Sequence, residues 1–193
     1  MASLRQKLES IFNNYNTALI DIQESMLRQD DWLLVASAYV LLAASFESTL
    51  KDVLTWLLQF KEQSTNINSG YIQTITTIIE WEYGVKDSGD GNWKSQFVDL
   101  CKPSNRNSGK ELHRIFMLLP NTLEHKMIFE SMINNVIHKR NNVAHGTVFL
   151  KPTLRSSYNQ ESLLIDIEQC MQLKDVLKAA CEDLIKADTT PMC

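Results

Sequence analysis

The sequence predicts an all-α protein, a helix bundle of four long helices with an inserted segment of short ones. Apolar residues recur at steps of three and four over four long stretches, which is the period of a helix with one buried face. The 193 residues include only six glycines and four prolines, which disfavours a β fold rich in tight turns. Because this length suits one core, we expect a single domain over residues 1–188, followed by a flexible tail at 189–193.

The first long helix is predicted over residues 3–28 and the second over residues 32–61. Asp30 or Asp31 can cap the second helix, since a carboxylate oxygen accepts hydrogen bonds from the free amides of a first helical turn. The buried stripe of the first helix consists of Leu4, Leu8, Ile11, Phe12, Tyr15, Leu19, Ile22 and Met26. The second half of the second helix is amphipathic through Leu50, Val53, Leu54, Leu57 and Leu58.

The first half of the second helix is apolar nearly all round. Trp32 to Phe46 is a run of fifteen residues without a charge. A membrane-spanning helix needs about 20 apolar residues, and this run also contains Ser37 and Ser45. We therefore interpret it as the central helix of the bundle, with a membrane segment as the less favoured alternative.

Residues 62–120 are predicted to be a mid-chain insertion into the bundle. Short helices are expected near residues 71–82, 93–101 and 110–119, although the interleaved Ile and Thr of the first also fit a strand. Clusters of Gly, Ser, Asn and Asp separate these helices and predict turns.

The third long helix is predicted over residues 122–145, with Asn121 or Thr122 as its cap. Gly146 stands where helices commonly end in a left-handed residue. Thr147 to Leu150 fits a short extended piece, residues 152–159 fit a loop, and the fourth long helix follows over residues 160–187. The buried positions expected in these two helices are Leu123, Met127, Ile128, Met132, Val136, Ile137, Leu163, Leu164, Ile167, Met171, Val176, Ala180 and Leu184.

The charge balance is mildly acidic, with a formal net charge of −4. The surface as a whole therefore does not attract polyanions, and nucleic acid would have to be bound by a local basic patch. The candidates for such a patch are residues 138–140 together with Lys94, Lys102, Arg106, Lys110 and Arg114.

The four cysteines form no CxxC pair and have no histidine at zinc-ligand spacing. A disulfide framework or a zinc site is therefore not expected, and a reducing compartment fits this usage. The N-terminus lacks the apolar stretch of a signal peptide. We accordingly expect a cytoplasmic protein without a membrane partner.

The strongest chemical signal is the segment Ile137–Gly146, in which Arg140 and His145 lie five positions apart. Arginine can hold a phosphate through two parallel hydrogen bonds, and histidine moves protons near neutral pH. An RNA strand carries its own nucleophile in the 2′-hydroxyl. Such a pair can therefore cleave a phosphodiester without a metal, with Asn141 or Asn142 orienting either group.

The spacing of this pair is awkward on a straight helix. Five residues rotate by about 500°, so positions 140 and 145 lie about 140° apart around the axis. Either the helix ends near His145 and lets the ring turn back, or a second subunit presents its own copy of the pair. From spacing alone, solvated surface groups are the more common interpretation of such residues, and the other histidines, His113, His125 and His138, fit that interpretation too.

The segment Arg140–Gly146 resembles the Arg-x4–6-His motif of the HEPN superfamily, including the polar residue directly after the arginine. The segment Ala38–Glu47 is similar to the apolar second helix with an embedded acid found in several HEPN families. The motif also lies near the end of a late long helix that one more helix follows. The resemblance thus covers most of the chain as architecture, and these two segments as sequence.

This resemblance implies a HEPN-like helix bundle and a metal-independent endoribonuclease of the RiboL-PSP-like type, with no metal and no cofactor. By that match Arg140 and His145 are the catalytic residues and Asn141 supports them. Glu47 carries over as a further catalytic residue, because a carboxylate that follows an apolar run needs a partner. Pairing with Arg140 or His145 would orient the site, and a salt bridge to another basic residue is the alternative.

The resemblance also implies partners. These are an RNA substrate, with Lys139 and Asn142 as substrate-binding residues, and a second copy of the chain in a homodimer with a composite active site. The context would be a toxin–antitoxin or phage-defence system, with an antitoxin or a defence-system protein as a further partner. The alternative function is a non-catalytic HEPN module that binds RNA, a nucleotide or a partner protein, as the acidic balance suggests.

Overall fold

A computed structural model describes residues 2–26, 31–63, 115–116, 119 and 122–189, and these are the described residues below. Every regular element among these residues is a helix and none is a strand, which confirms the predicted all-α bundle. The four long helices are α1 (Ala2–Met26), α2 (Trp32–Gln63), α6 (Lys126–Ala144) and α8 (Gln160–Thr189). Of the short helices predicted within 62–120, only residues 115–116, which are helical, and residue 119 are described; the rest, the basic residues 94–114 and residues 190–193 of the predicted tail lie outside the described residues.

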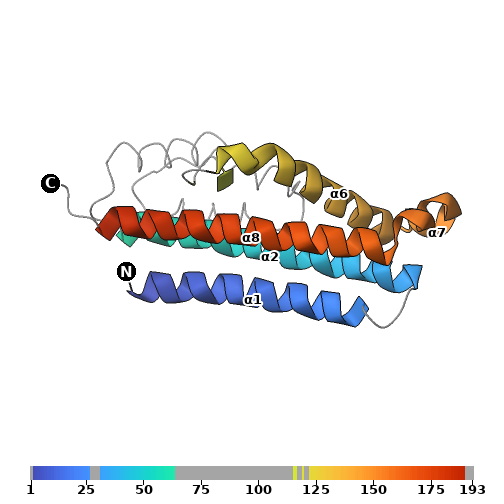
Figure 1. Ribbon diagram of the computed structural model, residues 1–193, viewed down its shortest axis with the longest axis horizontal. Helices are drawn as coiled ribbons and strands as arrows, with labels where there is room; N and C mark the ends of the chain where they lie inside the picture. Colours follow the sequence, from blue (N-terminus) through green and yellow to red (C-terminus); the bar gives the residue numbers. More distant parts are fainter. Residues whose placement is uncertain (1, 27–30, 64–114, 117–118, 120–121, 190–193) are drawn as a thin grey trace, which may run out of the picture.

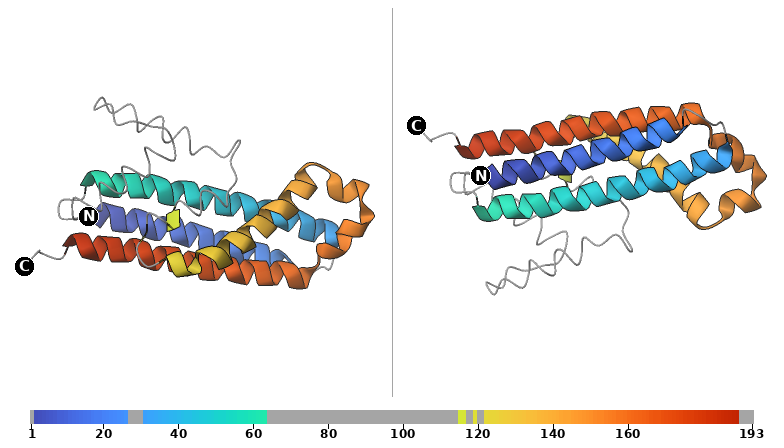
Figure 2. Two further views of the ribbon diagram at one scale, coloured as in Figure 1. Left: turned by 90° about the horizontal axis from the view of Figure 1, so that it is seen from above. Right: turned by 90° about the horizontal axis from the view of Figure 1, so that it is seen from below.

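Helices α1, α2 and α8 lie side by side along the bundle, with α1 antiparallel to the other two (Figure 1). Helix α6 crosses obliquely over α2 and α8 on the side away from α1 (Figure 2). Three short elements complete the described fold: η2 (Leu123–His125), α7 (Thr147–Leu150) and η3 (Pro152–Ser157). Helix α7 and η3 lie at the end of the bundle where α6 turns back into α8 (Figure 1).

Apolar side chains from all four long helices meet in one core. The stripe predicted for α1 is buried, apart from the half-buried Ile11. Each leucine or phenylalanine so buried contributes about 1.5–3 kcal/mol. Between α1 and α2, the indole Nε1 of Trp56 donates a 2.9 Å hydrogen bond to the backbone carbonyl of Leu4, which satisfies a buried donor and fixes the register of the two helices.

Helix α2 contacts α1, α6 and α8, as its apolar first half predicts. Its stretch Trp32–Leu57 is long and apolar enough to cross a membrane, the single such stretch among the described residues, and half of it is buried inside the bundle. Core helices of bundles and signal sequences meet the same criterion. One strip of α2 still faces solvent, where Leu33 is 43% and Leu41 is 59% exposed.

The buried face of α6 differs from the predicted one at its N-terminal end. Met127 and Ile128, which were expected to be buried, are 81% and 64% exposed. The buried side chains of this helix are Phe129, Met132, Ile133 and Val136. Because α6 crosses the bundle obliquely, only this narrow face touches it, and Met127 lies nearly opposite on the helical wheel.

The helix ends follow ordinary capping chemistry. The backbone amide of Leu33 donates to Oδ1 of Asp31 at 2.9 Å, so Asp31 caps α2, while Asp30 lies outside the described residues. Asn159 caps α8 in the same way, through a 2.8 Å bond from the amide of Ser162. Thr122 does not cap α6, contrary to prediction, because η2 lies between them. The hydroxyl of Thr122 donates instead to the carbonyls of Phe116 and Leu119.

Helix α6 ends as predicted, at a left-handed glycine. His145 occupies the C-cap position, and Gly146 has a φ of 69°. The amide of Gly146 donates to the carbonyl of Val143 at 3.0 Å, as in a Schellman-type end. Thr147–Leu150 then forms the helical turn α7, so the extended piece expected there is wrong: the left-handed residue restarts a helix, and η3 fills most of the predicted loop 152–159.

We predict that Gly146→Ala destabilises the protein by about 1 kcal/mol, because an L-residue in the left-handed region strains its Cβ against the following carbonyl. A Cβ built on Gly146 meets nothing within 4 Å, so no clash adds to this cost. Urea denaturation followed by circular dichroism measures the change. Gly146→Asn is the control and should lose less, since asparagine tolerates this conformation; equal stability of the alanine variant and the parent would contradict the prediction.

Candidate functional site

Arg140 and Glu47 form an ion pair between α6 and α2. Nη2 of Arg140 donates to Oε1 of Glu47, and the side chains are 28% and 17% exposed. The apolar run before Glu47 places this carboxylate at the contact of α2 with α6, where it requires a cation. Of the partners predicted for Glu47, Arg140 is thus observed.

The pair leaves part of the guanidinium available. Arginine has five N–H donors in a planar fork, and the hydrogen bond to Glu47 uses one nitrogen, Nη2. A carboxylate on one side therefore fixes the orientation of the group while its other donors can bind an anion. The same carboxylate also offsets the positive charge, so Arg140 acts here as a directed donor more than as an isolated cation.

His145 lies at the end of the helix that carries Arg140. Its backbone amide still donates to the carbonyl of Asn141 at 2.9 Å, so the helical path continues to this residue and the offset of about 140° from Arg140 holds. The residue is exposed, whereas Arg140 is directed at α2. The helix end expected at His145 is present, and the imidazole is accessible from solvent.

The two asparagines between Arg140 and His145 are both half-buried. The carbonyl of Asn141 accepts the amide of His145 in the last i→i−4 hydrogen bond of α6. The side chain of Asn142 hydrogen-bonds the hydroxyl of Tyr158, which offsets part of the rise in the pKa of Tyr158 that burial causes. Asn142 thus already has a partner on the segment that leads into α8.

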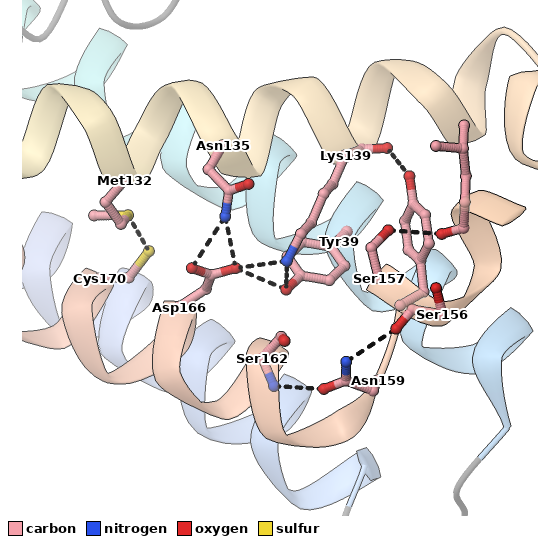
Figure 3. Close-up of polar contacts among 12 residues, drawn as sticks. Tyr39, Met132, Asn135, Lys139, Ser156, Ser157, Asn159, Ser162, Asp166 and Cys170 are labelled. Atoms are coloured by element: carbon pink, nitrogen blue, oxygen red, sulfur yellow. Dashed lines mark hydrogen bonds and ion pairs between the residues drawn. The ribbon is translucent and has the colours of Figure 1, made fainter.

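Lys139 lies next to Arg140 but is directed into the bundle. Its Nζ is 3.3 Å from Oδ2 of Asp166 on α8 and donates to the hydroxyl of Tyr39 on α2 at 2.6 Å (Figure 3). The side chains of Lys139 and Asp166 are 12% and 8% exposed. The ammonium is therefore occupied by Asp166 and Tyr39, and its position gives no support to the substrate-binding role predicted for Lys139.

The Asp166 carboxylate is the centre of this buried network. Tyr39 donates to Oδ2 of Asp166 at 2.7 Å, and the side-chain amide of Asn135 lies 3.4 Å from the same oxygen (Figure 3). Burial, and then the hydrogen bond to Asp166, raise the pKa of Tyr39. The hydroxyl therefore keeps its proton and remains a donor to the carboxylate.

A second tyrosine holds the same region from the other side. The hydroxyl of Tyr158 donates to the backbone carbonyl of Lys139 at 2.8 Å, and its ring packs edge-on against Tyr39 at 5.9 Å between centroids. Together these contacts fix α6 against α2 and α8 directly beside Arg140.

Sequence reasoning missed this network. A signal for it exists: Asp166 lies between Leu163 and Ile167 on the buried stripe of α8, and a carboxylate on such a stripe needs a cation or several donors. Lys139 is the cation that meets this need.

The charges around the candidate site are strongly biased. Residues 131–160 contain four Lys and Arg and no Asp or Glu, whereas the remainder of the chain has fifteen Lys and Arg against twenty-three Asp and Glu. Lys139 and Arg140 are neutralised by carboxylates from α8 and α2. Lys151 and Arg155 form no ion pair with a described carboxylate. Within the described residues, no three His, Cys, Asp or Glu side chains are grouped so as to hold a metal ion.

The fold and the site define a class of protein: an all-α bundle with an arginine anchored on an acid of the second helix and a histidine at the end of the arginine's helix. The chain matches the model of the RiboL-PSP-HEPN family over residues 2–187, and it therefore belongs to this family of the HEPN superfamily. HEPN domains are often ribonucleases or RNA-binding modules. No curated protein and no solved structure matches the chain.

We predict that Lys139→Met costs about 3–5 kcal/mol of unfolding free energy, because it leaves the buried Asp166 carboxylate without its cation. Asp166→Leu should cost a similar amount by stranding the ammonium. The double variant should recover most of the loss, since an apolar pair of similar volume replaces a buried ion pair at little cost. Urea denaturation of all four proteins measures this coupling, and additive losses would contradict a buried pair.

Proposed function

We propose that this protein is a metal-independent endoribonuclease with Arg140 and His145 as its catalytic residues, and that it acts in the cytoplasm as the toxin of a toxin–antitoxin or phage-defence system. The observation that carries the proposal is the Arg140–Glu47 pair beside an accessible His145. The membership in a HEPN family supports it. An antitoxin or a defence-system protein would restrain the activity.

In the proposed reaction the RNA supplies the nucleophile. His145 removes the proton of a 2′-hydroxyl or gives one to the leaving 5′-oxygen, as a general base or acid. Arg140 binds the phosphate and stabilises the charge that builds on its oxygens. Glu47 positions the guanidinium, and Asn141 supports the pair from the same helical turn. The 2′-oxygen forms a bond to phosphorus and the bond to the 5′-oxygen breaks, which leaves a 2′,3′-cyclic phosphate and a free 5′-hydroxyl.

We further propose that two copies of the chain complete the site. Within one chain Arg140 is directed at α2, while His145 lies about 140° away and is exposed. A two-fold axis near the end of α6 would bring the histidine of one copy to the arginine of the other. A symmetric contact of this kind is the commonest form of protein oligomer.

We predict that His145→Ala lowers the cleavage of a single-stranded RNA by about 10²–10⁴-fold, the usual contribution of general acid–base catalysis. Gel analysis of a labelled RNA measures the rate, and EDTA should leave it unchanged. His138→Ala is the matched control, because His138 is an exposed histidine of the same helix. Cleavage by the His145 variant at the parental rate, or a strict monomer in light scattering at micromolar concentration, would count against the site as proposed.

Glu47 is a positioning residue in this proposal, and its variants should separate turnover from binding. Glu47→Gln keeps an acceptor for Arg140, whereas Glu47→Ala removes it, so kcat should fall in the order parent, Gln, Ala, by up to about 10²-fold. The KM should stay within a few fold, because removing a negative charge does not weaken phosphate binding. Equal kcat for the Ala variant and the parent, at equal thermal stability, would remove Glu47 from the site.

The second candidate is a non-catalytic module of the same family that binds RNA, a nucleotide or a partner protein. The observation that favours it is the neutralisation of Arg140 by Glu47 in a chain of net charge −4. Expression in a bacterial host separates the two candidates. Growth inhibition by the parent but not by His145→Ala supports the enzyme, and equal tolerance of both supports the module.

A further inference from the structure

Three side chains form an ordered aromatic surface at the end of the bundle next to His145. Trp32 begins α2, Phe149 lies on α7, and Arg155 lies on η3. The rings of Trp32 and Phe149 pack edge to face at 5.7 Å between centroids, and the guanidinium of Arg155 lies 4.7 Å above the Trp32 ring. We refer to these three residues as the α7 platform.

Hydrogen bonds to the backbone connect the elements that carry Phe149 and Arg155. The guanidinium of Arg155 donates to the carbonyl of Phe149 at 3.4 Å, which ties η3 to α7. The amide of Phe149 donates to the carbonyl of Gly146 at 3.1 Å. Phe149 is thus held one helical turn from Gly146, the residue that follows His145.

Phe149 is the exposed member of the platform, whereas Trp32 and Arg155 are half-buried. Phe149 is 47% exposed, so the part of its ring away from Trp32 is available to a ligand. Lys151 directly follows α7. It is exposed and forms no ion pair with a described carboxylate. Two of its members, Phe149 and Arg155, lie within the segment 131–160, which contains no Asp or Glu, whereas Trp32 follows Asp31 at the start of α2.

We propose that the α7 platform stacks an unpaired base of single-stranded RNA on Phe149, beside the phosphate held at Arg140 and His145. An exposed aromatic ring with neighbouring cations is the usual arrangement for binding single strands, because every base has a flat face and every phosphate a charge. Four residues span at most about 14 Å from His145 to Phe149, so the stacked base lies close to the cleaved bond. This inference rests on the proposed function and adds a preference for unpaired RNA.

Binding rather than cleavage tests the inference. In a His145→Ala background, fluorescence anisotropy with a labelled 12-nucleotide RNA and with its blunt duplex measures affinity without turnover. Phe149→Ala should weaken binding of the single strand by roughly 10-fold or more and leave the duplex unchanged. Phe149→Tyr should retain binding. Leu150→Ala is the matched control, since Leu150 is 82% exposed on the same turn but offers no flat ring.

Equal affinity of Phe149→Ala and its parent for the single strand would overturn the inference, as would equal losses in the Phe149 and Leu150 variants. A changed molecular mass of Phe149→Ala in light scattering would also overturn it, because the surface would then join two copies of the chain. If the wild type cleaves RNA but binding does not depend on Phe149, this inference alone is wrong. If binding depends on Phe149 but the wild type does not cleave RNA, the proposed ribonuclease function alone is wrong.

Discussion

The buried contact between Lys139 and Asp166 determines how the rest of the site is arranged. A charge inside a bundle must be paired, so α6 can take only the rotation that brings Lys139 to α8. The next residue, Arg140, is turned by about 100° and reaches the acid of α2. Two adjacent cations therefore bind two different helices, and this pairing specifies both the rotation and the height of α6. Tyr39 joins the same carboxylate from α2, so all three helices share one polar centre.

The described fold was largely predictable because most of it follows from periodicity. The stripe of α1, the capping of α2 by an aspartate and the glycine that ends α6 are local features, and each is visible in the sequence. Met127 and Ile128 were misjudged because their exposure depends on the crossing angle of α6, which no local pattern specifies. The turn α7 was misjudged because four residues after a left-handed glycine carry too little pattern to separate a helix from a strand.

The candidate site was predictable in its residue types but only partly in its contacts. The rule that an acid at the end of an apolar run needs a cation predicted a partner for Glu47 but left Arg140, His145 and other basic residues open, and the structure shows Arg140. The same rule applied to Asp166 would have predicted a cation such as Lys139 as its partner. Which carboxylate each of two neighbouring basic residues binds depends on the helix face that each one occupies. The direction of that face is known only once the helix is packed.

The glycine that ends α6 also begins α7, so one backbone conformation places both His145 and Phe149. No atom lies within contact distance of a side chain added there, and the residue has no chemistry of its own. In a genetic screen for loss of the proposed toxicity, substitutions of Gly146 would nonetheless be recovered together with those of His145. An assay that measures growth alone would thus assign Gly146 to the candidate site, although this residue contributes only a backbone torsion angle.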